Sequence, residues 1–303
     1  MKLSIVIPIY NQPLSLDLTL FWFEKVISDE CEIIVIDDGS TENIREIVEK
    51  YEKTINLKYV YRNNGGRSAA RNTGLFMAEG NRVLFNDGDR FPALSDLRDH
   101  INAKGVMTGA HMEFYFMRPE KKVDVIKNDF EKIKHQARKI AFPSLVRDNL
   151  YDPSGNCATN MGWMSFLTGN VSAPKDALIE VKGFDEGFIS WGVEHFDLGY
   201  RLWNLNIPFE FSDKSVNYHI AHGREAGFYR NNMKNSTDYF YSKYNDPLLH
   251  SFADFLFGLI SLQELEEKAK NVRFDVAPWL SLKQEDIFFK GLQSDILAKP
   301  SQQ

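Results

Sequence analysis

The first hundred residues alternate between short apolar runs and segments with helical periodicity. The run Leu3–Ile9 is short and rich in β-branched residues, as a strand buried on both faces should be. Similar runs follow over residues 31–36, 57–61 and 82–85. Helical patterns separate the runs, over residues 14–28, 42–53 and 68–78, with Ser40 or Thr41 as the cap of the second helix. This order predicts an α/β fold with a mainly parallel, doubly wound sheet and helices on both faces.

The pattern is less regular beyond residue 104. Residues 105–116 predict another strand, whereas the charge-rich stretch from 118 to about 160 has no clear period and is interpreted as an excursion or lid. The tail from about Pro247 is helical and apolar, and we expect it to pack on its own domain or in a dimer. We divide the chain into a domain over 1–245, with halves 1–104 and 105–245, and a helical C-terminal extension over 246–303.

Polar clusters follow the ends of the predicted strands. In doubly wound sheets, ligands bind at the carboxyl ends of the strands, so these clusters are expected to face one cleft. The clusters are Tyr10-Asn11, Asp37-Asp38, Asn63-Asn64-Gly65-Gly66-Arg67 and Asp87-Gly88-Asp89.

The segment Asp87-Gly88-Asp89 places two carboxylates on either side of a glycine, whose backbone freedom allows both to face one point. Such oxygen ligands suit Mg²⁺ or Mn²⁺. A short Asp-Gly-Asp segment is by itself more often a solvated turn. The second acidic strand end, at Asp37-Asp38, favours the metal site, because two such ends on one edge repel unless a cation or hydrogen-bond donors satisfy them.

The Gly-rich segment before Arg67 opens a helix, and a helix N-terminus favours anions. Arg67 and Arg71 lie four residues apart on one helical face, and guanidinium groups bind phosphate oxygens in pairs. The alternative is two surface arginines at a loop-to-helix junction. Anion binding is favoured because the acidic clusters nearby need compensation.

Composition narrows the class of protein. The chain has 43% hydrophobic and 26% charged residues and a net charge of -6, so it carries no basic stripe for a nucleic acid. Its two cysteines, Cys31 and Cys157, fit a reducing compartment. The N-terminus lacks the pattern of a signal peptide, and no apolar run approaches the ~20 residues that span a bilayer. We therefore expect a cytoplasmic protein, with peripheral membrane association through the C-terminal helices left open.

Four segments of the first ninety residues, in this order and spacing, resemble the family 2 glycosyltransferases with the GT-A fold. They are Ser4-Ile5-Val6-Ile7-Pro8-Ile9-Tyr10-Asn11, Ile36-Asp37-Asp38-Gly39-Ser40-Thr41, Gly66-Arg67-Ser68-Ala69-Ala70-Arg71-Asn72-Thr73-Gly74 and Asp87-Gly88-Asp89. A second block, from Gly169-Asn170 through Gly183-Phe184-Asp185 to Trp191-Gly192-Val193-Glu194-His195, is similar to the acceptor side of chondroitin polymerase, β-1,4-galactosyltransferase and polypeptide GalNAc-transferase modules. The resemblance implies a nucleotide-binding half over 1–104 and an acceptor-binding half over 105–245.

The resemblance also implies roles by position. Tyr10 and Asp38 would hold the uracil of a UDP-sugar, Asp87 would lie near the ribose, and Arg71 would lie beside the nucleotide and its phosphates. Pro8 and Arg67 are further candidates for binding the nucleotide sugar. Asp89 would bind Mn²⁺ or Mg²⁺. A late histidine often completes such a site, and His219 and His222 are both candidates. They are expected to point to opposite faces of a strand, so only one of them is expected to be a ligand. Trp191 is expected to be a platform for the sugar or the acceptor, with core packing as the alternative.

The chain departs from the family pattern at the catalytic base. Related inverting enzymes have Glu-Asp after Trp-Gly-x, with the aspartate as base, whereas this sequence has Glu194-His195. His195 could act as the base, since histidine titrates near neutral pH, and Asp197 is a weaker substitute. A role for His195 in packing or acceptor contact is equally open, as is the stereochemical outcome.

The sequence thus predicts a metal-dependent transfer of a sugar from a UDP-sugar to a hydroxyl of a glycan or polypeptide, in bacterial-type polysaccharide or glycoconjugate synthesis. One alternative is a non-catalytic module that binds nucleotide sugars. A sugar nucleotidyltransferase is a weaker alternative, because Tyr10-Asn11-Gln12-Pro13 is not the Gly-rich basic loop that such an enzyme needs after its first strand. A homodimer through the C-terminal helices is left open.

Overall fold

The computed structural model describes residues 1–115, 119–221, 228–244 and 246–270. The strands are β1 (Leu3–Ile9), β2 (Cys31–Asp37), β3 (Leu57–Tyr61), β4 (Arg82–Phe85), β5 (Arg90–Phe91), β6 (Val106–Phe114), β7 (Arg138–Lys139), β8 (Val171–Pro174) and β9 (Phe209–Ile220). The helices are α1 (Pro13–Val26), α2 (Ile44–Tyr51), α3 (Gly66–Met77), α4 (Arg98–Asn102), α5 (Pro119–Ile133), α6 (Ala141–Leu150), α7 (Lys175–Glu180), α8 (Glu194–Trp203), α9 (Phe228–Tyr244), α10 (Pro247–Leu256) and α11 (Leu262–Ala269). None of the helices in these ranges is long and apolar enough to cross a membrane.

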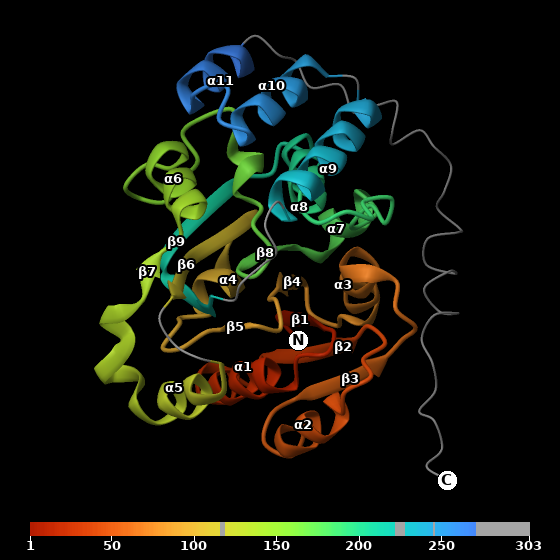
Figure 1. Ribbon diagram of the computed structural model, residues 1–303, viewed down its shortest axis with the longest axis vertical. Coiled ribbons are helices and arrows are strands. Elements are labelled where there is room, and N and C mark those ends of the chain that lie inside the picture. Colours follow the sequence, from red (N-terminus) through yellow and green to blue (C-terminus); the bar gives the residue numbers. More distant parts are fainter. Residues whose placement is uncertain (116–118, 222–227, 245, 271–303) are drawn as a thin grey trace.

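One sheet runs through the molecule in the order β3-β2-β1-β4-β8-β6-β9-β5, with β7 paired to β6 (Figure 1). The strands β1 to β4 are parallel to their neighbours in this group, and β6 is parallel to β9. The strands β5, β7 and β8 run antiparallel to the strands beside them. The predicted α/β fold is confirmed, and the second half of the chain adds the antiparallel strands that make the sheet mixed.

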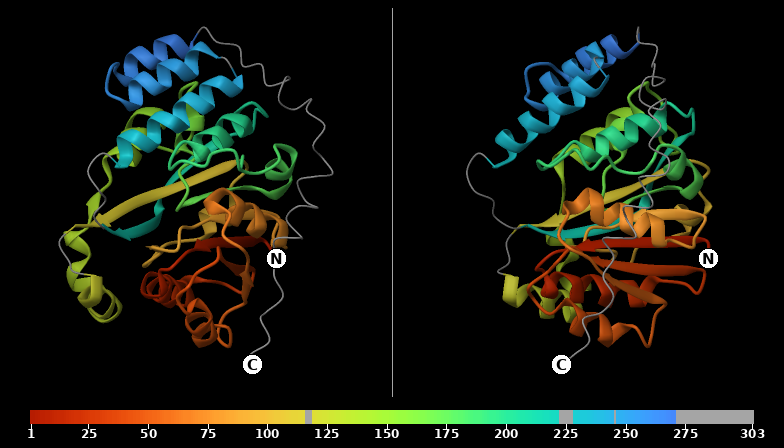
Figure 2. Two further views of the ribbon diagram at one scale, coloured as in Figure 1. Left: turned by 45° about the vertical axis from the view of Figure 1, so that its right-hand side comes forward. Right: turned by 90° about the vertical axis from the view of Figure 1, so that its right-hand side faces the viewer.

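Helices cover both faces of the parallel part, with α1 and α2 on one side and α3 on the other (Figure 2). Successive side chains of β1 point to opposite faces of the sheet. Ile5 and Ile7 pack in the cluster that contains Phe23 of α1, whereas Val6 packs in the cluster that contains Leu75 of α3. This alternation explains why the apolar runs of the first half are continuous.

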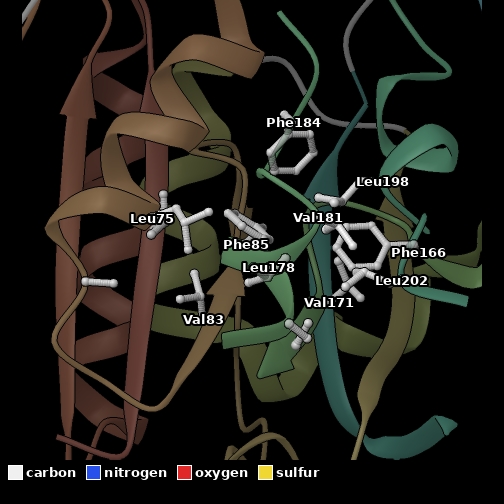
Figure 3. Packing of buried hydrophobic residues seen from close by; sticks show 14 of the residues in the cluster. Leu75, Val83, Phe85, Phe166, Val171, Leu178, Val181, Phe184, Leu198 and Leu202 are labelled. Carbon is white, nitrogen blue, oxygen red and sulfur yellow. The ribbon is translucent and has the colours of Figure 1, made fainter. Parts of the chain in front are cut away.

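A shared core joins the two halves of the chain (Figure 3). The ring centroids of Phe85 in β4 and Phe184 in the second half lie 5.0 Å apart, edge to face. Leu198 of α8 belongs to the same buried cluster as Val83 of β4. Because the halves bury their side chains against each other, their surfaces are held in a fixed relation.

The C-terminal helices pack on the rest of the chain. Phe252 of α10 is fully buried, with its ring centroid 4.7 Å from that of Trp163 and 5.0 Å from that of Phe196. Leu265 of α11 belongs to the same core cluster. Within residues 246–270, the apolar face of the predicted extension is therefore occupied mainly by its own chain, although Leu259 remains 72% exposed. Residues 271–303 of the extension lie outside the described residues.

Two local predictions are wrong. The stretch interpreted as an irregular excursion contains the helices α5 and α6. Ile126 and Phe130 of α5 are both buried, on either side of a kink at Asp129. The segment has few apolar residues, so its sequence pattern is weak, but these residues are buried in a core cluster and stabilise the helix there. The cap of α2 is Asn43, whose Oδ1 accepts a hydrogen bond from the backbone N–H of Glu46 at 3.2 Å, rather than Ser40 or Thr41.

Candidate active site

A cavity of about 770 Å³ lies at the carboxyl ends of β1, β2 and β4. The chain runs from β1 outward to β3 and returns to the other side of β1 with β4, so the ends of β1 and β4 diverge and leave a crevice. Most of the residues predicted for a site line it: Pro8, Tyr10, Asp38, Arg67, Arg71, Asp87, Asp89, Trp191, Glu194, His195 and His219. The expectation that the acidic turn at residue 88 and the pair at residue 38 share one cleft is confirmed.

Gly88 is favoured because a side chain at this position would collide with β1, and not because the backbone needs a left-handed conformation. Its φ angle is not in the left-handed region, which corrects the reason that the sequence suggested. A Cβ atom at this position would lie 2.5 Å from Cδ1 of Ile9 and 3.1 Å from the carbonyl oxygen of Pro8. The glycine therefore lets the acidic turn approach the end of β1, which brings Asp87 and Asp89 to the cavity.

Asp38 is held by the segment that was expected to bind an external anion. Its Oδ1 accepts hydrogen bonds from Nη1 of Arg62 at 2.7 Å and from the backbone N–H of Gly65 at 3.1 Å. Its Oδ2 accepts one from the backbone N–H of Gly66 at 2.8 Å. The anion at the start of α3 is thus Asp38 itself, because a helix N-terminus attracts any negative charge within reach. Arg62, which the sequence analysis missed, is the buried cation of this pair.

Tyr10 also lines the cavity, and about half of its surface is exposed. The next residue, Asn11, has a φ of 51° and its Oδ1 accepts hydrogen bonds from the backbone N–H groups of Thr41 and Glu42. This clamp ties the loop after β1 to the loop after β2. The ring of Tyr10 and the carboxylate of Asp38 are therefore positioned by connected loops.

Arg71 lines the cavity, but its guanidinium lies between two carboxylates. Its Nη1 donates to Oε1 of Glu194 at 3.1 Å, and its Nη2 donates to Oδ1 of Asp87 at 2.9 Å and to the hydroxyl of Thr168 at 3.2 Å. Burial lowers the pKa of Arg71, but the charges of Asp87 and Glu194 more than offset this effect, so the guanidinium stays protonated. Arg71 thereby links the acidic turn to α8. Arg67, one turn earlier, is exposed and lines the cavity.

Glu194 is the first residue of α8 and is 3% exposed. Burial raises the pKa of its carboxyl, but His195, Arg71 and Arg67 lower it further, so the pKa lies well below the ordinary value and the group is ionised. Its Oε2 has no hydrogen-bond partner among the described residues. Gly192 and Val193 precede it with φ angles of 90° and 74°, an unfavourable conformation for valine that turns the chain into α8 at the cavity wall.

His195 and Trp191 flank this turn and both line the cavity. The imidazole Nδ1 of His195 lies 3.9 Å from Oε2 of Glu194, beyond hydrogen-bond distance, and its ring centroid lies 4.1 Å from that of Phe196. The backbone of Trp191 is held from α9, since its N–H donates to Oδ1 of Asn232 at 3.2 Å.

Asp89, His219 and Glu113 form a second polar group in the cavity. Nε2 of His219 lies 3.3 Å from Oδ2 of Asp89, and its Nδ1 lies 2.6 Å from Oε1 of Glu113. Burial lowers the pKa of His219, but the hydrogen bonds with Asp89 and Glu113 raise it by more, so the pKa lies above the ordinary value. Glu113 comes from β6, which lies beside β9, and the sequence analysis missed it.

The pair of Asp89 and His219 fits a metal ion that takes its other ligands from a substrate. An imidazole that ligates a metal usually donates its second N–H to a carboxylate, as His219 can to Glu113. Within the described ranges no cluster of three or more His, Cys, Asp or Glu side chains is arranged to hold a metal alone. The other predicted ligand, His222, lies outside the described residues.

Arg90 and His111 also line the cavity, and the sequence analysis named neither. Nη1 of Arg90 lies 3.4 Å from Nδ1 of His111, and Nε of Arg90 lies 3.7 Å from Oδ2 of Asp87. Burial and the nearby guanidinium lower the pKa of His111 well below the ordinary value, so this imidazole is neutral. Arg90 directly follows the acidic turn, which was the available signal that it belongs to the site.

Asp197 is not part of the cavity, and the expectation that it substitutes as a base is wrong. It is fully buried, and its carboxylate accepts hydrogen bonds from Nη2 of Arg201 at 2.6 Å and from the hydroxyl of Tyr244 at 2.8 Å. It lies three residues after Glu194 on the same helix, but the turn that brings Glu194 to the cavity leaves Asp197 facing α9. Asp197 therefore attaches α9 to α8.

Two family models match the chain. Residues 4–142 match the model described as glycosyl transferase family 2, and residues 154–223 match the one described as N-terminal domain of galactosyltransferase. The two matches contain the acidic clusters and the block around Glu194, respectively. Every residue that lines the polar part of the cavity therefore lies within a matched region.

Relatives of known name agree with these models. The chain is 29% identical over 240 residues to validoxylamine A glucosyltransferase of Streptomyces hygroscopicus subsp. jinggangensis, covering 73% of this chain and 56% of that protein. It is 31% identical over 240 residues to chondroitin synthase of Escherichia coli, covering 72% of this chain and 34% of that protein. The chain thus spans between a third and somewhat over half of these relatives.

A solved structure shows the same fold. The structure of S. aureus TarS 1-349 in complex with UDP-GlcNAc superposes with a TM-score of 0.57 at 20% identity, covering 78% of this chain and 66% of that chain. The family models, the relatives and the fold agree with the resemblance in the sequence. The chain belongs to the family 2 glycosyltransferases.

Proposed function

We propose that this protein transfers a sugar from a UDP-sugar onto a hydroxyl group of an acceptor, with the help of Mn²⁺ or Mg²⁺. The observation that carries the proposal is the single cavity in which Asp38, Asp89 and His195 meet. The strand ends of the first half would hold the donor, and α8 of the second half would present a base to the acceptor.

The donor end of the cavity suits a uridine nucleotide. The exposed ring of Tyr10 can contact the uracil face, and Asp38 retains acceptor capacity at Oδ2, which takes one hydrogen bond from Gly66. The relative TarS has been solved in complex with UDP and with UDP-GlcNAc, which supports a UDP-sugar as donor. Arg67 and Arg90 are the cations of the cavity that we expect to face the diphosphate.

The metal would be held by Asp89 and His219, with phosphate oxygens and water completing its ligands. When bound, the ion supplies positive charge that stabilises the leaving diphosphate. Glu113 holds Nδ1 of His219 and so keeps Nε2 directed to Asp89. We expect the imidazole of His219 to lose its proton at Nε2, next to Asp89, before His219 can bind the ion.

His195 is the better base of the two residues at the start of α8. The pKa of Glu194 lies well below its ordinary value, so its carboxylate is a weak base, and His195 is the other side chain available there. The acceptor oxygen forms a bond to the anomeric carbon, the bond from that carbon to the diphosphate breaks, and the hydroxyl proton passes to His195. Trp191 borders the same space and would contact the sugar or the acceptor.

The names of the relatives, a glucosyltransferase and a chondroitin synthase, support a glycan or glycoconjugate as acceptor and a role in its synthesis, and a polypeptide acceptor remains an alternative. We also propose a cytoplasmic location, since both cysteines are free. Peripheral association or a homodimer through the C-terminal helices remains a hypothesis.

The test is release of UDP from a panel of UDP-sugars, with Mn²⁺, with Mg²⁺ and with a chelator. We expect turnover that depends on the metal, and Asp89→Ala should abolish it while circular dichroism and the melting temperature stay close to the wild type. The control is Asp148→Ala, which removes an exposed carboxylate that does not line the cavity. Near-normal turnover by Asp89→Ala would contradict the proposal.

A non-catalytic module that binds nucleotide sugars is the second candidate, prompted by His195 in place of an acidic base. The same assay separates the two. A binder would show a rise in melting temperature with UDP-sugar and Mn²⁺, because ligand binding stabilises the native state, but would release no UDP.

A further inference from the structure

The cavity has a charged side and an apolar side. Its charged lining residues come from the strand ends, from α3 and from the start of α8. The segment at the start of α6, together with α9 and α10, contributes described lining residues that are all apolar. We call this set the apolar wall: Ile140, Phe142, Pro143, Met233 and Leu256.

The apolar wall is continuous with the position of the base. The ring of His195 contacts that of Phe196 at a centroid distance of 4.1 Å, and Phe196 contacts Phe142 at 5.6 Å. Phe142 and Leu256 are half-buried and pack against the same core cluster as Phe196, so the wall is a firm surface. A molecule whose hydroxyl lies at His195 therefore has this wall beside it.

The wall also leads out of the cavity. Leu256 is followed by an apolar run at the end of α10, which includes Phe257, Leu259 and Ile260. Leu259 is 72% exposed, and Gly258 with a φ of 74° ends the helix there. Apolar side chains thus extend from the cavity lining to the surface of the molecule.

A second sugar ring is a poor occupant for this wall. The hydroxyls of a sugar lose hydrogen bonds to water on binding and need partners in their place. Among the described residues of the wall, none offers a polar side chain. A hydrocarbon group needs no such partner and gains free energy in proportion to its buried area.

We propose that the apolar wall binds a hydrocarbon chain of the acceptor, so that the acceptor carries an alkyl or isoprenoid group next to its reacting hydroxyl. This inference rests on the proposed function and specifies its acceptor. The hydroxyl lies at His195, the chain lies along Phe142 and Leu256, and its far end leaves the cavity past Leu259.

The probes are pairs of n-octyl and methyl β-glycosides of glucose, galactose, N-acetylglucosamine and N-acetylgalactosamine. Each is titrated by calorimetry into the full chain with UDP and Mn²⁺, below the concentration at which octyl glycosides form micelles. For at least one sugar, the octyl glycoside should bind at least about tenfold more tightly than its methyl partner, since burial of about two methylene groups has an effect of this size. Equal affinities within every pair, or binding by neither member, would overturn the inference.

Variants localise the effect. Phe142→Ser and Leu256→Ser should each reduce the octyl-to-methyl ratio several-fold and leave the affinity for UDP unchanged. Leu14→Ser, which alters an exposed leucine of α1 outside the cavity, is the matched control and should keep the ratio. A ratio unchanged in both wall variants would place the octyl chain elsewhere and contradict the assignment.

The titrations also keep this inference distinct from the proposed function. The proposed function fails if the protein releases no UDP from any UDP-sugar, whether or not the UDP-sugars bind. The inference about the apolar wall fails if UDP binds but no octyl glycoside binds more tightly than its methyl partner. Titration of the glycosides without UDP and Mn²⁺ measures the affinity of the apolar wall for the octyl chain independently of the donor.

Discussion

Nη1 of Arg71 lies 3.1 Å from Oε1 of Glu194, although 123 residues separate the two in the chain. The same guanidinium binds Asp87 at the acidic turn through Nη2. Arg71 belongs to the region that matches the family 2 model, and Glu194 to the region that matches the galactosyltransferase model. One buried cation thus holds the acidic turn of the first matched region and the start of α8 in the second in a fixed relation.

Replacement of this cation should destabilise the fold. In Arg71→Met, the buried Glu194 loses its partner, and an uncompensated buried charge costs about 3–5 kcal/mol. Chemical denaturation would measure the change in the free energy of unfolding. The double variant Arg71→Met/Glu194→Gln should regain part of the loss, because the uncompensated charge is gone. Strictly additive effects would show that the two residues are not coupled.

Stability should fall in acid partly through Glu194. The pKa of this carboxyl is lowered in the folded protein, so its contribution is complete above the ordinary pKa near 4.5 and is lost as pH falls below it. Between pH 5 and pH 3 the wild type should lose up to about 1.4 kcal/mol per pH unit more than Glu194→Gln. Denaturation at a series of pH values measures this difference. Parallel curves for the two proteins would contradict the assignment.

Glu113→Gln should weaken metal binding about 10–100-fold, because the carboxylate that orients His219 is replaced by a neutral amide. Mn²⁺ binding in the presence of UDP can be followed by electron paramagnetic resonance, which needs no turnover. Glu180→Gln, an exposed residue at the end of α7, serves as the control. Unchanged Mn²⁺ affinity in Glu113→Gln would remove Glu113 from the metal site.

His195→Asn should lower the rate of transfer about 10²–10⁴-fold while the affinity for UDP stays the same, because the variant lacks the group that takes the proton. His250→Asn, which changes an exposed histidine of α10, is the control. Transfer by His195→Asn at the wild-type rate would leave His195 with only a packing role.

The first four strands, the strand over residues 105–116, the order of the first helices and most of the residues expected to bind the donor could be predicted because their signals are local. The run Leu3–Ile9 is apolar at every position, since β1 is covered on both faces. The acidic clusters come directly after strands, and parallel strands end at one edge. The clusters that contain Asp38, Asp87 and Asp89 were therefore found from their positions after strands, and the family resemblance implied the role of each residue.

The partners of these residues could not be predicted, because they depend on contacts between distant elements. Arg62 binds Asp38, and Glu113 binds His219, but no local sequence pattern predicts either pair. Asp197 and Glu194 are both acidic and share one helix, and only the packing of α9 shows that one is structural and the other lines the cavity.

The sequence by itself determined the fold class, the family and the edge of the sheet where the site lies, because apolar periodicity and turn residues act over a few neighbouring positions. The tertiary structure decided how the charges of that site are paired, that Arg71 lies between two carboxylates, and that one side of the cavity is apolar. These properties arise when the two halves bury a common core, which brings side chains more than a hundred residues apart into contact.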